Sequence, residues 1–273
     1  MKKILLTGVS GYLGSNLLEK INKKNYLILG VDKKTSNHKF KNYKFLKSDL
    51  RNLKLPNSFK PDIIIHLGSL NSEKFYRKET FNSYNIDINS TLKICKIASK
   101  YKAKNLIFAS SEWVYGDNNR LKILNEKINI NRNLLSSFYA LSKIICEDLI
   151  KIFYKNKLIS NYIILRLGIF YGERKKPNSA VEGIFKDIKE NKKVIVNSSL
   201  KSSRKFIHVE DVSDAIIKSI NIKKPYTINV AGKRLVSLKQ IMDYSSKIIN
   251  KKYYAQSLNK KNFVSRNISN RLS

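Results

Sequence analysis

The sequence predicts an α/β protein in which a doubly wound parallel sheet is followed by a smaller C-terminal lobe. Three observations support this prediction. The apolar run Ile4-Leu5-Leu6 leads directly into glycines at three-residue spacing and then into a helical pattern. Strand-like and helix-like segments alternate from that point to Leu165, which is typical of a parallel sheet covered by helices. Beyond Arg166 the alternation loosens, which indicates a second, smaller unit.

The first strand is followed by a glycine loop. Gly8, Gly11 and Gly14 stand three residues apart, with Tyr12 and Leu13 before the last of them. Glycine accepts positive φ and lets another backbone or a phosphate approach closely. The free N–H groups and the positive dipole end of the next helix then face the loop. Three glycines can also form a simple turn, but the strand before them and the helix after them favour a seat for the pyrophosphate of a dinucleotide.

The second strand, residues 26–31, ends at Asp32. An acid at the end of the second strand of a βαβ unit is placed to accept hydrogen bonds from the hydroxyls of the adenosine ribose. It would repel a 2′-phosphate, so Asp32 predicts NAD rather than NADP. Lys33 and Lys34 follow at once and weaken this preference. The alternative is an aspartate that only forms a turn.

Each later strand brings polar or small residues to its C-terminal end, the edge at which open α/β sheets bind ligands. We expect strands at 43–47, 61–68 and 105–109, and a long helix at 78–100. The residues delivered by the three strands are Ser48, Asp49 and Leu50, then Leu67, Gly68 and Ser69, then Ser110 and Ser111.

An amphipathic helix begins near Tyr139 and carries Lys143 four residues later, so the two side chains share one face. A phenol has a pKa near 10, and a lysine ammonium within a few ångströms lowers the pKa of such a group in a partly desolvated site. The Tyr-x-x-x-Lys spacing alone is common on surface helices. After a glycine loop, an acid at the second strand and a serine pair at a strand end, it predicts a tyrosine acid/base beside its activating cation.

The smaller lobe follows Arg166. We expect a helix at 180–190, a strand at 194–196, a helix at 209–220, a strand at 226–230 and a helix at 238–250. The predicted division is a dinucleotide-binding domain at 1–165 and a substrate-binding lobe at 166–273, partly interleaved with it.

The chain is strongly basic. Its 273 residues carry a formal charge of +34, and 44 of the 54 basic residues are lysines spread along the chain. Nucleic-acid-binding proteins tend to gather basic residues on one face and often use arginine. We therefore favour compositional drift, without a specific nucleic-acid partner, over a functional basic surface, which stays the alternative.

Membrane and metal sites are not expected. No apolar run is long enough to cross a bilayer, and the run at residues 4–6 is too short for a secretory signal. Cys95 and Cys146 are predicted to be buried thiols in a reducing compartment, so we expect a cytoplasmic protein. His38, His66 and His208 lack the spacing of metal ligands, and we expect no metal site.

Five motifs stand in the order found in extended short-chain dehydrogenases/reductases. They are residues 7–14, 110–116, 139–143, 166–172 and 204–211. From Lys2 to about residue 272 the sequence therefore resembles the NAD-dependent nucleotide-sugar epimerases and dehydratases of that family. The resemblance implies a Rossmann fold, NAD as cofactor, a nucleotide sugar as substrate and a homodimer.

The resemblance also implies residue roles. Ser111 would hydrogen-bond the reacting sugar oxygen, Tyr139 would be the acid/base, and Lys143 would anchor the ribose and activate the tyrosine. His66 and His208 would be structural. The implied NAD-binding residues are Gly8, Gly11, Tyr12, Leu13, Gly14, Asp32, Asp49 and Leu50 beside the adenine, Leu67, Gly68 and Ser69 beside the nicotinamide, and Tyr139 and Lys143. The implied substrate contacts are Ser111, Glu112, Trp113 and Arg204, the last on the diphosphate.

The sequence departs from the family pattern at several positions. The 4,6-dehydratases often carry Asp-Glu after the catalytic threonine, where this chain has Glu112-Trp113, which argues against dehydration. Asp87 and Ile169 stand where the family usually has asparagine. Residues 267–273 resemble a segment that opens a closing helix of the sugar-binding lobe in relatives, which leaves open a clipped lobe.

We expect an NAD-dependent epimerase or oxidoreductase acting on a nucleotide sugar at C4. The alternatives are a 4-keto-sugar reductase, a 4,6-dehydratase, and a non-enzymatic RNA-binding or nucleotide-sensing relative. The sequence does not decide which sugar is bound.

Overall fold

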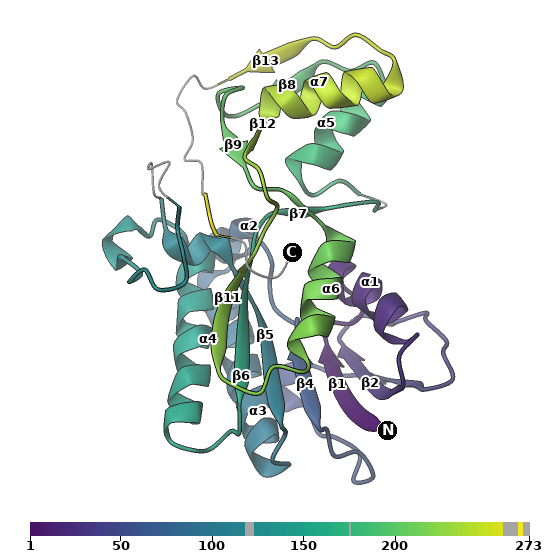
Figure 1. Ribbon diagram of the computed structural model, residues 1–273, viewed down its shortest axis with the longest axis vertical. Coiled ribbons are helices and arrows are strands. Elements are labelled where there is room, and N and C mark those ends of the chain that lie inside the picture. Colours follow the sequence, from purple (N-terminus) through teal and green to yellow (C-terminus); the bar gives the residue numbers. More distant parts are fainter. Residues whose placement is uncertain (118–122, 175, 259–266, 270–273) are drawn as a thin grey trace.

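A seven-stranded parallel sheet dominates the structure, a computed structural model that describes residues 1–117, 123–174, 176–258 and 267–269 (Figure 1). The strand order is β11-β6-β5-β4-β1-β2-β3. Because the order reverses between β1 and β4, ligands are expected at the carboxyl ends of those strands. The predicted doubly wound sheet of the Rossmann type is confirmed. Its strands are β1 (Lys2–Thr7), β2 (Tyr26–Asp32), β3 (Tyr43–Lys47), β4 (Ile63–His66), β5 (Asn105–Ser111), β6 (Tyr162–Leu167) and β11 (Tyr226–Val230).

Helices cover both faces of this sheet. One face packs on α1 (Tyr12–Ile21) and α6 (Val209–Ser219), and the other on α3 (Thr80–Lys100) and α4 (Phe138–Lys155). Successive residues of a strand point to opposite faces, so Leu6 joins the core under α1 and α6 while Leu5 joins the core under α3 and α4. This is why the strands read as continuous apolar runs.

Short helical pieces follow the strands at their carboxyl ends. They are η1 (Leu50–Asn52) after β3, α2 (Glu73–Lys78) after β4, η2 (Glu112–Tyr115) after β5, and η3 (Arg132–Leu134) before α4. The helix α2 was not predicted. The long helix expected at residues 78–100 begins at Thr80, two residues after α2 ends.

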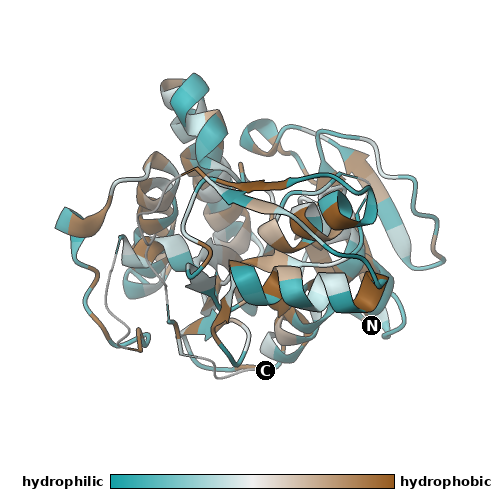
Figure 2. Ribbon diagram, turned by 90° about the horizontal axis from the view of Figure 1, so that it is seen from above, coloured by the Kyte–Doolittle hydropathy of each residue, from teal (hydrophilic) through white to brown (hydrophobic). Residues whose placement is uncertain are grey.

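A smaller part lies at the top of Figure 1 and is built on α5 (Ala180–Lys189) and α7 (Leu238–Ile249). The short strands β8 (Val194–Val196) and β13 (Ala255–Ser257) pair beside these helices. Both helices carry apolar and polar residues along their length (Figure 2). Their apolar residues form a separate core together with Val194 of β8, and the helical members are Ile184, Ile188, Leu238, Ile241 and Met242. Two short pairs, β7 (Phe170–Tyr171) with β10 (Ile207–His208) and β9 (Ser203–Arg204) with β12 (Val236–Ser237), complete the elements.

Two segments assigned to the smaller lobe belong elsewhere, which corrects that part of the prediction. Residues 209–220 form α6, which packs on α1, and residues 226–230 form β11, the edge strand of the large sheet beside β6. The chain thus returns to the sheet after α5. The division near residue 165 stays a proposal, with more interleaving than expected.

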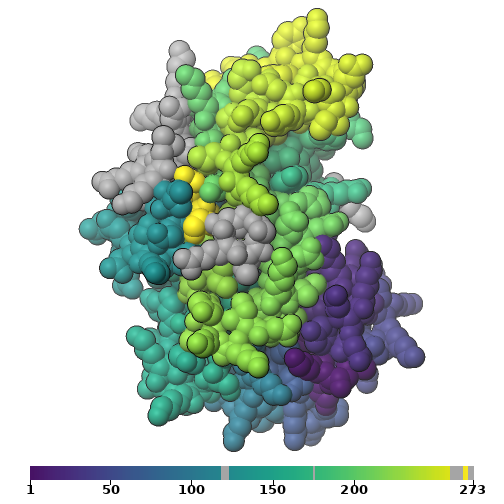
Figure 3. Space-filling model, viewed as in Figure 1, coloured from purple at the N-terminus to yellow at the C-terminus, as the bar shows by residue number. Residues whose placement is uncertain are grey.

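Residues 267–269 lie against the backbone of Leu124 and form hydrogen bonds with it. Ile268 is fully buried and bridges Leu124, and its carbonyl accepts a hydrogen bond from Lys205 Nζ at 2.8 Å. Figure 3 shows this tripeptide in yellow beside the teal segment that includes residue 124. Within the described ranges, none of the helices has the length and apolar character needed to cross a membrane.

Candidate active site

The glycine loop forms a tight bend between β1 and α1. Gly8 adopts φ of +73°, and a Cβ there would lie 2.7 Å from the backbone nitrogen of Gly68. A Cβ on Gly14 would lie only 2.1 Å from the carbonyl oxygen of Gly8. Only glycine allows these approaches. Gly11 precedes α1 without capping its first-turn N–H groups by a side chain, which leaves these donors for an anion.

Asp32 lies directly beside this loop at the end of β2. Its Oδ2 accepts the N–H of Ser10 at 3.0 Å, and its Oδ1 accepts the N–H of Lys34 at 2.9 Å. Two backbone donors fix the carboxylate while its other lone pairs stay available to ribose hydroxyls. The loop and Asp32 therefore fit the pyrophosphate and ribose of NAD.

The neighbouring lysine is turned to another acid. Lys33 Nζ lies 2.8 Å from Asp49, and Arg51 forms a bidentate contact with the same carboxylate, at 2.7 Å for the closest pair. The hydrogen bonds from Arg51, together with Lys33, hold the pKa of Asp49 far below its usual range. Leu50 comes next and is buried against Gly68, whose added Cβ would lie 2.5 Å from Leu50 Cδ1. These contacts place Asp49 and Leu50 at the β3 end of the sheet edge.

Tyr12, the first residue of α1, connects the loop to the smaller part. The guanidinium of Arg174 stacks on its ring, with 3.6 Å from Arg174 Cζ to the ring centroid. Arg174 in turn pairs with Glu182 of α5 at 2.7 Å. A residue of the predicted cofactor loop is thereby tied to a helix of the predicted substrate lobe. Leu13, next in the loop, is buried in the core under α1.

A chain of hydrogen bonds fixes the end of β4. The N–H of Gly68 donates to Thr7 Oγ1 at 3.1 Å, and Thr7 Oγ1 lies 2.8 Å from His66 Nδ1. His66 Nε2 lies 3.3 Å from Thr91 Oγ1, which donates to the carbonyl of Asp87. Since each hydroxyl has one proton, Thr7 donates to Nδ1 and the Nε2 proton goes to Thr91. His66 is thus neutral, and burial with the charge of Lys143 lowers its pKa to about 3.

Tyr139 and Lys143 face one another on α4, as their spacing predicts. Lys143 Nζ lies 5.7 Å from the centroid of the Tyr139 ring. It donates to Ser69 Oγ at 2.6 Å and to the carbonyl of Ala109 at 3.1 Å, and it stacks over Phe108. The lysine therefore bridges the carboxyl ends of β4 and β5 under the phenol.

The end of β5 brings three predicted residues to the same place. Ser111 is buried and caps η2 by accepting the N–H of Trp113 at 3.3 Å. The indole of Trp113 meets the ring of Tyr139 edge to face, with 6.2 Å between centroids. Glu112, which lies between Ser111 and Trp113 in the sequence, is 1% exposed. Arg204 lies in the smaller part on β9, where it donates to the carbonyl of Ser203.

A buried ionic cluster behind Ser111 was not predicted. Glu147, one turn beyond Lys143 on α4, accepts Ser110 Oγ at 2.6 Å and two hydrogen bonds from Arg166, at 3.0 and 2.7 Å. Arg166 also donates to the hydroxyl of Tyr115. Burial raises the pKa of Glu147, but the hydrogen bonds and charge of Arg166 outweigh it and the pKa lies below its usual value. The sequence signal for this cluster was Glu147 itself, an acid on the apolar face of an amphipathic helix.

The N-terminus of α4 is capped from α2, which sequence reasoning also missed. Glu73 accepts the hydroxyl of Ser137 at 2.6 Å and the N–H of Tyr139 at 3.0 Å. Tyr76, one turn later, reaches Asp87 and Ser142. The only sequence signal for these contacts was Asp87, which stands where the family usually has asparagine. His208 was expected to be structural, and its ring accepts the N–H of Glu210 at the start of α6.

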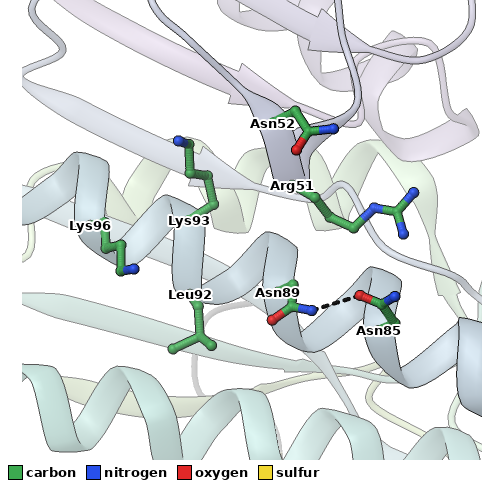
Figure 4. A pocket seen from close by; sticks show the side chains of 7 residues that line it. All are labelled: Arg51, Asn52, Asn85, Asn89, Leu92, Lys93 and Lys96. Atoms are coloured by element: carbon green, nitrogen blue, oxygen red, sulfur yellow. Dashed lines mark hydrogen bonds between the residues drawn. The ribbon is translucent and has the colours of Figure 1, made fainter.

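A separate hollow of about 590 Å³ lies between η1 and α3 (Figure 4). Its lining is Arg51, Asn52, Asn85, Asn89, Leu92, Lys93 and Lys96, none of which was predicted as a site residue. Asn89 donates to Asn85 across one turn of α3. Among the described residues, no cluster of three or more His, Cys, Asp or Glu could hold a metal ion.

The model of the NAD dependent epimerase/dehydratase family matches residues 4–231. The chain belongs to this family. It is therefore an NAD-dependent enzyme, as the resemblance implied. The protein is 30% identical over 252 residues to a putative UDP-glucose 4-epimerase of Methanocaldococcus jannaschii, covering 88% of this chain and 80% of that one. It is 28% identical to the dTDP-D-glucose 4,6-dehydratase of Dictyostelium discoideum, covering 84% and 58%.

Solved structures of this family share the fold. A UDP-N-acetylglucosamine 4-epimerase of Methanobrevibacter ruminantium, in complex with UDP-N-acetylmuramic acid, superposes with a TM-score of 0.87 at 24% identity over 100% of this chain and 90% of that one. The UDP-glucuronic acid 4-epimerase of Bacillus cereus, in complex with UDP-glucuronic acid and NAD, has a TM-score of 0.86 at 22% identity over 99% and 90%.

Proposed function

We propose that this family member is a 4-epimerase of a UDP-activated sugar, with Ser111, Tyr139 and Lys143 as its catalytic residues. The observation that supports this most is the position of Lys143: its Nζ lies 5.7 Å from the centre of the Tyr139 ring and donates to the carbonyl of Ala109 on β5, the strand that ends at Ser111. Relatives described as 4-epimerases of UDP-glucose and UDP-glucuronate support C4 as the reacting carbon of the sugar.

The roles of the side chains follow from their chemistry. Bound NAD supplies hydride transfer at the sugar carbon. Tyr139 takes the proton of the sugar hydroxyl during oxidation and returns it during reduction, and Ser111 donates a hydrogen bond to the same sugar oxygen. The ammonium of Lys143 stabilises the phenolate because opposite charges attract strongly where water is excluded. Arg204 pairs with the diphosphate of the substrate.

Trp113 favours epimerisation over dehydration. Elimination of water needs a second acid/base, and this chain has an indole beside the Tyr139 ring at the position where dehydratases often carry glutamate. Trp113 then lines the sugar rather than acting on it. The aromatic face of Trp113 suits the apolar face of a sugar ring.

We also propose a homodimer built on α4. On α4, Phe138, Leu141, Ile145, Leu149 and Ile152 recur at helical spacing, and Ile152 keeps 53% of its surface exposed. Such a stripe typically meets a partner. Leu149→Lys with Ile152→Lys should convert a dimer into a monomer in sedimentation experiments. Ile195→Lys, at a residue 55% exposed on β8, is the control. The cytoplasm stays our proposed location, which cell fractionation would test.

The function is tested with purified protein, NAD and a panel of UDP-glucose, UDP-N-acetylglucosamine, UDP-glucuronic acid and dTDP-glucose. An epimerase gives a product of unchanged mass with inverted C4 in nuclear magnetic resonance spectra. Loss of water identifies a dehydratase. In a second assay that supplies NADH and a 4-keto-sugar nucleotide, net consumption of NADH identifies a reductase. Absence of any turnover across the panel contradicts the proposal.

A further inference from the structure

The short helix α2 is fixed to α4 at a second point beyond Glu73. The side chain of Tyr76 is fully buried, and its hydroxyl lies 2.6 Å from Asp87 Oδ2 and 2.7 Å from Ser142 Oγ. The ring of Tyr76 also meets the ring of Tyr139 edge to face, with centroids 6.1 Å apart. Tyr76 thus links α2, α3 and α4 next to the proposed acid/base.

Asp87 receives donors from two directions. Its Oδ1 accepts the N–H of Leu70 at 2.8 Å, and its Oδ2 faces Tyr76. Tyr76 has one hydroxyl proton and a carboxylate is a stronger acceptor than an alcohol, so Tyr76 donates to Asp87. Ser142 Oγ also lies 3.5 Å from Asp87 Oδ2. Burial raises the pKa of Asp87, while the charge of Lys143 and these hydrogen bonds oppose the rise.

The loop after β4 is held between Asp87 and Lys143. Leu70, which donates to Asp87, directly follows Ser69, which accepts from Lys143. The residue Lys143 is 2% exposed, and the hydrogen-bond partners of its ammonium, Ser69 Oγ and the carbonyl of Ala109, are neutral oxygens. The loop after β4 is therefore fixed by two neighbouring residues, with Ser69 bound to Lys143 and Leu70 bound to Asp87.

We propose that Asp87 and Tyr76 are positioning residues of the cofactor site. Asp87 holds the loop of residues 67–70 against Lys143 by accepting the N–H of Leu70, and Tyr76 fixes the Asp87 side chain through its hydroxyl. An asparagine at this position would keep an acceptor for Leu70 but carry no charge. The inference rests on the proposed function only in that it takes Lys143 and this loop as part of the NAD site.

The test measures the dissociation constant of NAD by isothermal titration calorimetry and the melting temperature in the same buffer. Asp87→Ala removes the acceptor and the charge, and the dissociation constant should rise ~10-fold or more. Asp87→Asn keeps the acceptor and should restore part of this loss. Tyr76→Phe should weaken binding less than Asp87→Ala. Asp148→Asn on the exposed side of α4 and Tyr162→Phe on β6 are matched controls and should bind NAD normally.

The outcomes separate positioning from simple structural support. If both Asp87 variants melt earlier yet bind NAD within about twofold of the unsubstituted protein, the proposal is wrong. Should Asp87→Ala fail to fold, the isosteric Asp87→Asn and Tyr76→Phe variants carry the same test. No sugar substrate is needed, so missing turnover in a protein that binds NAD contradicts the proposed function alone. Unchanged NAD affinity in the variants contradicts this inference alone.

Discussion

Acid should destabilise this protein through one histidine. Burial and the charge of Lys143 lower the pKa of His66 to about 3 in the folded chain, against about 6.5 in the unfolded chain. Between these values the unfolded state binds one more proton, so the free energy of unfolding falls as the pH falls below 6.5 and is fully kept above it. A protonated ring would also lose its acceptor for Thr7.

The size of the effect follows from the two pKa values. Each pH unit between them contributes at most ~1.4 kcal/mol, so the loss at pH 5 is ~2 kcal/mol relative to pH 8. For a chain of this length that lowers the melting temperature by roughly 3–4 °C. Thermal unfolding followed by circular dichroism from pH 8 to pH 4 measures it.

The comparison that isolates His66 uses His66→Gln. Gln keeps a donor and an acceptor but does not titrate, so its melting curve against pH should be flatter even if the variant starts less stable. Asp87, whose pKa is raised, contributes with opposite sign but does so in both proteins. His38→Gln is the control and should leave the slope unchanged. Parallel curves for the unsubstituted protein and His66→Gln between pH 7 and pH 5 would refute the reasoning.

Four further outcomes are expected. Tyr139→Phe should lower turnover by at least ~10²-fold with NAD affinity kept, and full turnover on the true substrate would disprove the acid/base role. Asp32→Ala should narrow the preference for NAD over NADP, which titration with both dinucleotides measures. Equal affinities in the unsubstituted protein would show that Asp32 does not set a preference for NAD. Glu147→Gln leaves the buried Arg166 without a negative charge to pair with and should cost ~3–5 kcal/mol in denaturant unfolding, whereas a loss near zero would show that the charge of Glu147 does not stabilise the fold. Nucleic acid should bind weakly and lose affinity steeply with salt, without sequence preference; selective RNA binding that survives raised salt would contradict the assignment of the charge to drift.

The sequence was informative wherever chemistry is encoded locally. The glycine loop, Asp32 and the pair Tyr139 and Lys143 depend on spacings of a few residues within one turn or helix, and the structure places each at the carboxyl edge of the sheet. The helical spacing fixed the shared face of the last two because α4 is regular over its whole length.

Contacts between distant segments could not be read in the same way. Glu73 caps α4 from 66 positions away, and its own helix, of only six residues, is too short to show a periodic pattern. β11 was assigned to the smaller lobe because a five-residue strand carries no sign of its neighbours. Its place beside β6 is decided by burial of the sheet edge, which is a property of the whole fold.

The stack of Arg174 on Tyr12 joins the first residue of α1 to the first turns of α5. If a ligand shifts the Tyr12 ring and thereby the ion pair between Arg174 and Glu182, the binding free energies on the two sides are linked. Linkage of this kind is reciprocal. The factor by which a dinucleotide changes the affinity of the smaller part for its own ligand must equal the factor by which that ligand changes the affinity for the dinucleotide.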